Sequence, residues 1–261
     1  MRRNQGITLL KKFFLEQPFV LAVWEAGSSA THRLDEYSDL DLLIITEDDK
    51  VELTLDATKQ FLENQLKDGT LIRAPEPTWH GFSQFFYIPK DEDLFYFDLS
   101  FTNISKPDKF TDIERHGTSN VWFEKQSIYQ PTHFEPSKAN ELCKKVFSSA
   151  TLYAPIIARE TQKALMRKGQ VDAISMYQTY LTRFLIPLLN IVYRPKKADF
   201  GVRYINIDYP QDVYRRIERL FSCRDLDEIQ KHLVKAEAWH KELQQMLVKN
   251  LLRSTSSTYN G

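Results

Sequence analysis

Two short groups of residues near the start of the chain have the composition and spacing to hold a phosphate and a metal ion. Gly27 and Ser28 follow an apolar run, where glycine permits a tight turn that offers backbone N–H groups and a hydroxyl. Asp39 and Asp41 lie on either side of Leu40. Because side chains alternate along a strand, both carboxylates point to one face and Leu40 to the other. Adjacent carboxylates repel unless a cation joins them, and oxygen ligands close to phosphate are a preferred setting for Mg²⁺.

A third acid, Asp98, lies in the middle of the aromatic run from Leu94 to Phe101. The apolar residues of this run take alternate positions, so Asp98 lies on the opposite face together with Tyr96. An aspartate inside so apolar a strand costs free energy unless it has a partner. Beside Asp39 and Asp41 on a neighbouring strand, it would complete a three-carboxylate site. Such a site can hold one or two Mg²⁺ ions for an in-line displacement at phosphorus.

The elements that must position these residues follow from the hydrophobic pattern of the first half of the chain. Short apolar runs bounded by polar residues are typical of strands, and apolar residues at helical spacing predict helices. Two aromatic runs joined by residues 89–93 predict an antiparallel hairpin. We therefore predict helices over 7–17 and 50–67, a short helix after Gly27, and strands over 19–24, 40–45, 82–88, 94–101 and 121–123.

The pattern changes after about Pro136, where apolar residues recur at helical spacing over 142–157, 174–188, 213–220 and 226–247. Such stripes are what helices bury against one another in a bundle. Pro155 and Pro187 fall inside these segments and should kink or split them. The sequence predicts an α+β fold with two domains. The first, residues 1–135, has a mixed β-sheet flanked by helices, and the second, residues 136–261, is an all-α helical bundle.

Composition limits the classes of function. The chain has 261 residues, 42% of them hydrophobic, which is enough for a core and too apolar for disorder. Its 35 basic residues are balanced by 35 acidic ones, which disfavours a protein whose main task is to bind the nucleic-acid backbone. Cys143 and Cys223 have no disulfide or zinc spacing and fit a reducing compartment. Because no apolar stretch could span a bilayer, we expect a cytoplasmic protein without a membrane partner.

The Gly27–Ser28 turn, the Asp39–Asp41 pair and the in-strand Asp98 together resemble the nucleotidyltransferase superfamily typified by DNA polymerase beta. The run from Ser38 to Leu42 is similar to that of the small bacterial aminoglycoside and lincosamide nucleotidyltransferases, in which a helical domain follows the catalytic one. The resemblance covers the whole architecture, although only residues 27–42 and 94–101 carry strong motifs.

The resemblance also implies roles for individual residues. Gly27, Ser28 and Arg33 would hold the nucleoside triphosphate, whereas Asp39, Asp41 and Asp98 would be catalytic and bind the metal ions. Asp98 would hold a second metal or assist deprotonation of the acceptor, and the sequence does not separate these roles. His32 departs from the pattern, because many relatives have glycine before the arginine position.

The resemblance implies a Mg²⁺-dependent transfer of a nucleoside monophosphate to a hydroxyl of a small acceptor, with release of pyrophosphate. The expected nucleotide is AMP, taken from ATP. An aminoglycoside or lincosamide antibiotic is one such acceptor. Two alternatives stay open: modification of a protein or tRNA, and a non-catalytic nucleotide-binding module. The neutral charge argues against tRNA, and the presence of all three acids argues against the module.

Other conspicuous residues have simpler interpretations. His240 lies on an apolar helical stripe and is expected to be packed rather than a ligand. The one basic concentration is expected to be solvated or salt-bridged, with contact to a triphosphate as the alternative. Its members are Arg194, Lys196, Lys197, Arg203, Arg215 and Arg216. Residues 47–49 are acidic and are expected to cap the helix that begins near residue 50.

Overall fold

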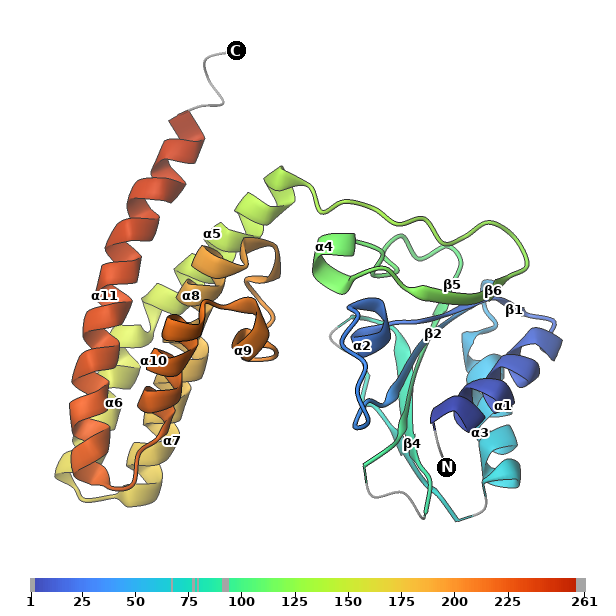
Figure 1. Cartoon of the computed structure of the whole chain (residues 1–261), viewed down its shortest axis with the longest axis horizontal. Coiled ribbons are helices and arrows are strands. Elements are labelled where there is room, and N and C mark those ends of the chain that lie inside the picture. Colours follow the sequence, from blue (N-terminus) through green and yellow to red (C-terminus); the bar gives the residue numbers. More distant parts are fainter. Residues whose placement is uncertain (1–2, 67, 77, 79, 91–93, 257–261) are drawn as a thin grey trace. The chain divides into compact units, whose positions relative to one another are not determined.

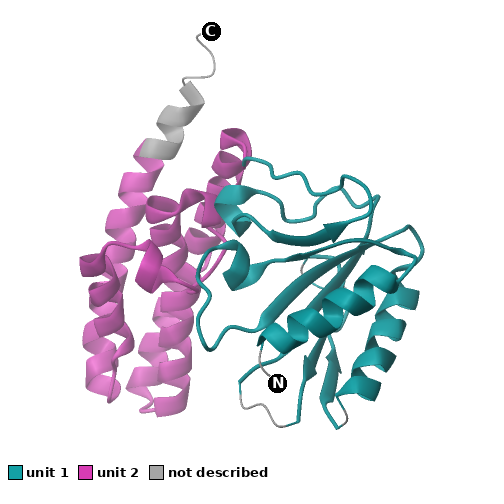
Figure 2. Cartoon of the chain, turned by 45° about the vertical axis from the view of Figure 1, so that its right-hand side comes forward, with its two compact units in different colours: residues 1–133 teal, residues 134–261 magenta. Residues whose placement is uncertain are grey.

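A computed structural model describes residues 3–66, 68–76, 78, 80–90 and 94–256. The chain divides into two compact units, Met1–His133 and Phe134–Gly261, each with its own hydrophobic core (Figure 2). The α+β prediction is confirmed, because the first unit combines a mixed six-stranded sheet with helices and the elements of the second unit are helical. A catalytic role for residues 1–135 and a substrate-binding role for residues 136–261 stay predictions.

Each predicted strand of the first unit forms, within one to three residues at most ends. Its helices are α1 (Arg3–Glu16), α2 (Gly27–Ala30), α3 (Val51–Gln65) and α4 (Ile113–His116). Its strands are β1 (Val20–Glu25), β2 (Leu40–Thr46), β3 (Thr70–Arg73), β4 (Ser83–Ile88), β5 (Phe97–Asn103) and β6 (Asn120–Glu124). The sequence did not predict β3, whose four residues are mostly exposed and show no alternation of burial. The predicted cap of α3 is wrong: Asp48 accepts hydrogen bonds from Ser105 instead.

The sheet has the strand order β3-β4-β5-β2-β1-β6. Among the paired strands that the structure describes, the central β2–β5 pair is parallel and the others are antiparallel. The predicted hairpin is confirmed, since β4 and β5 pair antiparallel with Phe86 opposite Asp98. Residues 91–93 of its predicted turn lie outside the described residues. The parallel pair at the centre brings the ends of two strands distant in sequence to the same edge of the sheet.

Helices α1 and α3 lie side by side on one face of the sheet (Figure 1). Leu10 and Phe14 of α1 and Leu55 of α3 share a core with alternate residues of the central strands, among them Leu40, Leu42, Ile44, Phe97, Leu99 and Phe101. The intervening residues of β2, Leu43 and Ile45, belong to a smaller cluster on the other face. By the same alternation, Asp41 and Asp98 project from the face that α1 and α3 leave uncovered.

The second unit is a helical bundle around a single large core, as predicted. Its elements are α5 (Pro136–Leu152), α6 (Ala154–Met166), α7 (Gln170–Tyr180), the π-helical turn η1 (Leu181–Leu185), α8 (Ile186–Tyr193), the 3₁₀ turn η2 (Pro195–Lys197), α9 (Ile205–Asp208), α10 (Gln211–Phe221) and α11 (Leu226–Ser256). Over the described part of the chain, no helix is both long and apolar enough to cross a membrane.

The two prolines act differently. Pro155 lies in the first turn of α6 and separates it from α5, as predicted. Pro187 lies in the first turn of α8, but there the helix continues through the wider turn η1. Proline has no N–H group to bond the carbonyl of Arg183, four residues earlier, and a π turn at this place accommodates the missing bond without breaking the helix.

Two polar side chains lie inside the second core. His240 is buried, and its Nε2 lies 3.0 Å from the carbonyl oxygen of Ala150, which confirms that it is packed. Arg194 is also buried and forms an ion pair with Asp208 (Nη1 to Oδ2, 2.9 Å), so the expectation of a salt bridge holds for this residue. Arg194 therefore supports the fold from inside rather than contributing to a basic surface.

Candidate active site

The parallel pairing of β2 with β5 places Asp41 directly beside Asp98. Neighbouring strands lie about 4.8 Å apart, so two carboxylates at paired positions are close neighbours on one face. Both residues are partly exposed, whereas Leu40 and Leu42 beside Asp41 are buried in the core. The juxtaposition concentrates negative charge at one place on the uncovered face of the sheet. The catalytic role of the two residues stays a prediction.

Asp39 and Tyr96 lie at the entrance to these two strands. The backbone N–H of Leu40 donates to the carbonyl oxygen of Tyr96 (3.1 Å), which holds the two chain segments together. The Tyr96 hydroxyl hydrogen-bonds to Asp39. Burial raises the pKa of Tyr96, and the hydrogen bond to Asp39 and the negative charges of Asp39, Asp41 and Asp98 raise it further. The neutral Tyr96 hydroxyl therefore lies close enough to all three predicted carboxylates for their charges to affect its pKa.

Gly27 packs directly against the carboxylate of Asp41. Its φ is +54°, and a Cβ at this position would lie 1.8 Å from Asp41 Oδ2, so only glycine fits. The preceding N–H group, of Ala26, donates to the backbone carbonyl oxygen of Asp41 (3.0 Å). Ser28 follows in the turn and is buried. The structure thus brings the predicted phosphate-binding turn and the predicted metal ligand Asp41 into contact.

The turn continues into α2, which has four residues and no side-chain cap at its start. A helix this short has little dipole, so an anion here would be held by individual N–H groups of the turn. The N–H of Arg33 donates to the carbonyl oxygen of Ser28 (2.8 Å), which closes the loop. His32 adopts φ +56°, the left-handed conformation that glycine favours. This gives a physical reason for glycine in the family pattern.

Residues from far along the chain support the end of α2. The N–H of Thr118 donates to the carbonyl oxygen of Ala30 (2.9 Å). Gly117, with φ +80°, approaches so closely that a Cβ there would lie 2.1 Å from the same oxygen. The sequence did not predict a role for either residue, because nothing in their local pattern indicates which segment they contact.

Gln84 is a further residue of this site whose role the sequence did not predict. It lies on β4 opposite Ser100 of β5, diagonal to Asp98. Its side-chain Nε2 donates to Asp98 Oδ1 at 2.6 Å. The alternation of β4 could have placed Gln84 on this face once the register of the hairpin was known, but the register was not readable from the sequence.

The donor chemistry of the site fits Mg²⁺. Asp39, Asp41 and Asp98 offer only carboxylate oxygens, which are hard ligands, and the absence of a Cβ at Gly27 lets the Asp41 carboxylate lie directly against the turn. In the described residues, no three His, Cys, Asp or Glu side chains are already arranged to hold a metal ion. Asp98 is hydrogen-bonded to Gln84 and Asp39 to Tyr96.

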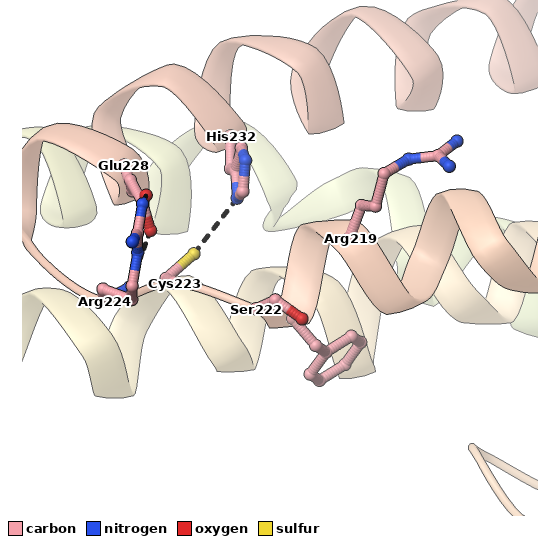
Figure 3. Close-up of a pocket in the computed structure, with 7 residues that line it drawn as sticks. Arg219, Ser222, Cys223, Arg224, Glu228 and His232 are labelled. Atoms are coloured by element: carbon pink, nitrogen blue, oxygen red, sulfur yellow. Dashed lines mark hydrogen bonds and ion pairs between the residues drawn. The ribbon is translucent and has the colours of Figure 1, made fainter.

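A pocket of about 460 Å³ in the second unit is a separate feature (Figure 3). Cys223 Sγ lies 3.2 Å from Nδ1 of His232 inside it, although the sequence spacing suggested no such pair. Burial, together with the charge of Glu228, raises the pKa of Cys223. At neutral pH the group is a thiol, and only the thiolate is a strong nucleophile. The pocket is lined by Arg219, Phe221, Ser222, Cys223, Arg224, Glu228 and His232.

Comparison with known proteins gives one family. Residues 7–85 match the model of the nucleotidyltransferase domain. Two solved structures are similar to this chain. The first is an aminoglycoside 6-adenyltransferase from Bacillus subtilis, which is 12% identical, with 100% of both chains covered and a TM-score of 0.36. The second is a nucleotidyltransferase-like protein from Exiguobacterium sibiricum, which is 12% identical, with 96% of this chain and 79% of that chain covered and a TM-score of 0.36. Among curated protein sequences, none matches.

Proposed function

We propose, from the premise that this chain is a nucleotidyltransferase with the family's domain at residues 7–85, that it moves AMP from ATP to a hydroxyl group of a small acceptor and releases pyrophosphate. The single observation that supports this most is the contact between the turn and the carboxylates. Gly27 lies against Asp41, and Asp41 pairs with Asp98 on the neighbouring strand. A glycine turn beside a group of acids suits a triphosphate that arrives with its cation.

In this proposal the turn holds the triphosphate and the acids hold the cation. Backbone N–H groups of Gly27 and Ser28 and the Ser28 hydroxyl would bind phosphate oxygens, and Arg33 would add a positive charge. Asp39 and Asp41 would ligate Mg²⁺, which when bound neutralises phosphate charge and polarises the α-phosphoryl group.

Asp98 would act on the acceptor side. The acceptor oxygen forms a bond to the α-phosphorus, the bond to the bridging oxygen of pyrophosphate breaks, and the hydroxyl proton must leave. Asp98, whose Oδ1 accepts a hydrogen bond from Gln84, would accept that proton or ligate a second ion. Tyr96 would keep Asp39 oriented, since its hydroxyl hydrogen-bonds to that carboxylate. Alignment of the two reacting oxygens at phosphorus supplies much of the acceleration.

The proposed acceptor class rests on the resemblance of the run from Ser38 to Leu42 to aminoglycoside and lincosamide nucleotidyltransferases. These antibiotics offer hydroxyl groups of ordinary nucleophilicity and need no cofactor besides the nucleotide and its cation. An aminoglycoside is polycationic, so an acidic site would also attract it electrostatically. The neutral net charge of the chain gives no corresponding attraction for tRNA.

The test is a transfer screen with ATP labelled at the α-phosphate, against aminoglycosides, lincosamides and a cell metabolite extract, read by mass shift of the product. An adenylylated small molecule supports the proposal. Label on protein or tRNA instead would favour the macromolecular alternative. Binding of Mg-ATP by calorimetry without pyrophosphate release, whatever the acceptor, would favour a non-catalytic module.

A further inference from the structure

A chain of hydrogen bonds leads from the loop before β4 to the carboxylate of Asp98. Its last bond joins Gln84 Nε2 to Asp98 Oδ1 at 2.6 Å, a short, charge-assisted contact. Its first member is His80, whose side chain hydrogen-bonds to Gln84. His80 is itself fixed, because its ring packs against Phe82 (centroids 4.7 Å apart) and Phe110 (5.9 Å).

The partners of His80 determine which of its nitrogens carries the proton. The backbone N–H of Phe82 donates to His80 Nδ1 (3.0 Å), so Nδ1 must be an unprotonated acceptor. The Thr78 hydroxyl also approaches Nδ1 (3.1 Å), but it donates its proton to the carbonyl oxygen of Phe82 (2.6 Å). The proton of the neutral ring is therefore on Nε2. Burial lowers the pKa of His80, which keeps the ring neutral.

This tautomer fixes the direction of the Gln84 amide. In this tautomer, the hydrogen bond between His80 and Gln84 runs from Nε2–H to the amide oxygen, which agrees with the amide NH₂ group donating to Asp98 Oδ1. We propose that Gln84, oriented by His80, is a positioning residue that holds Asp98 in the rotamer needed for cation binding and proton acceptance. Gln84 Nε2 donates to Oδ1 and so holds the carboxylate at one of its oxygens. Supporting hydrogen bonds to a ligating carboxylate commonly set its orientation and basicity.

The inference rests on the proposed function, so its test measures cation binding as well as transfer. The full chain is titrated with Mn²⁺ in the presence of α,β-methylene-ATP, whose α–β bridge is not cleaved, and free Mn²⁺ is followed by electron paramagnetic resonance. Asp98→Asn reports whether the site is the one proposed. Gln84→Met removes the donor and keeps the unbranched length. Gln84→Glu keeps the size and replaces the donor by a carboxylate, which serves if the Met variant does not fold.

The matched control is Ser83→Ala. Ser83 is the neighbouring residue on β4, points to the other face and hydrogen-bonds to Glu52 (3.3 Å), so its loss leaves Asp98 untouched. Gln84→Met should weaken Mn²⁺ binding by about 10–100-fold, the usual effect of losing such a partner. Ser83→Ala should not change it, and the thermal midpoints of both variants should stay close to that of the wild type.

The position of His80 in the chain gives a second readout. His80→Ala should weaken Mn²⁺ binding less than Gln84→Met, and it should add nothing in the Gln84→Met background, because both act through one hydrogen bond. Additive losses would overturn the role of His80. Wild-type affinity in Gln84→Met with a loss in Asp98→Asn would overturn the positioning role while the proposed function stands. No binding of Mn²⁺ and nucleotide by the wild type would overturn both.

Discussion

Replacing Gly27 by alanine should disable the site with only a modest effect on the fold. The substitution has two separable costs. A non-glycine residue at φ +54° loses about 1–2 kcal/mol of conformational free energy. The new Cβ would also lie 1.8 Å from Asp41 Oδ2, whereas ordinary contacts begin near 3.4 Å, so the carboxylate must retreat by more than 1 Å or the turn must open. A displacement of about 1 Å at a reacting centre costs on the order of 100-fold in rate.

Gly201→Ala is the matched control for this variant. Gly201 has nearly the same backbone conformation, with φ +62°, but no atom lies within 4 Å of the position its Cβ would take. Both variants should lose about 4–7 °C in thermal midpoint, as expected for about 1–2 kcal/mol in units of this size. Only Gly27→Ala should lose the affinity for Mn²⁺ with α,β-methylene-ATP. Wild-type affinity in Gly27→Ala would refute the reasoning that the turn and Asp41 form one site.

Three further changes have defined outcomes. Arg194→Met should lower the free energy of unfolding by about 3 kcal/mol in urea titrations, because it leaves Asp208 without its buried partner, and an unchanged midpoint would contradict this. Burial lowers the pKa of His240 from about 6.5, so the unfolded chain binds the proton more readily. The stability that neutral His240 contributes is therefore fully present above pH 6.5 and is lost as the pH falls below this value. His240→Leu should reduce this fall in thermal midpoint when the midpoint is measured against pH. His32→Gly should change stability by less than about 1 kcal/mol and leave nucleotide binding intact, since relief of a left-handed residue offsets the greater freedom of unfolded glycine; weaker binding would show that the imidazole takes part.

The local patterns of the sequence predicted most elements of the first unit, although not β3 or α4, and the face on which the acids lie. Asp41 and Asp98 could be placed on the polar faces of their strands because alternation fixes direction. Their pairing needed the order of the strands, and the resemblance to a family supplied that expectation. The parallel β2–β5 register then placed the two acids side by side.

What the sequence did not reveal depends on contacts between distant segments. Gln84, His80 and Gly117 have ordinary local surroundings, and each acquires its role from a residue that another segment brings near. In the sequence, Arg194 belongs to a basic stretch. In the structure it is buried, because its N–H groups donate hydrogen bonds to Asp208 and to the carbonyl oxygens of Gly201 and Arg203. Patterns of hydrophobicity do not report such partnerships.

The most direct test of the central claim compares the wild type with Asp41→Asn for transfer of the labelled α-phosphate from ATP, using the acceptor that the screen identifies. The substitution keeps the size of the side chain and removes its charge at the paired position beside Asp98. We predict that Asp41→Asn transfers no label above background while its thermal midpoint and circular dichroism match those of the wild type. Transfer at the wild-type rate by Asp41→Asn would contradict the account.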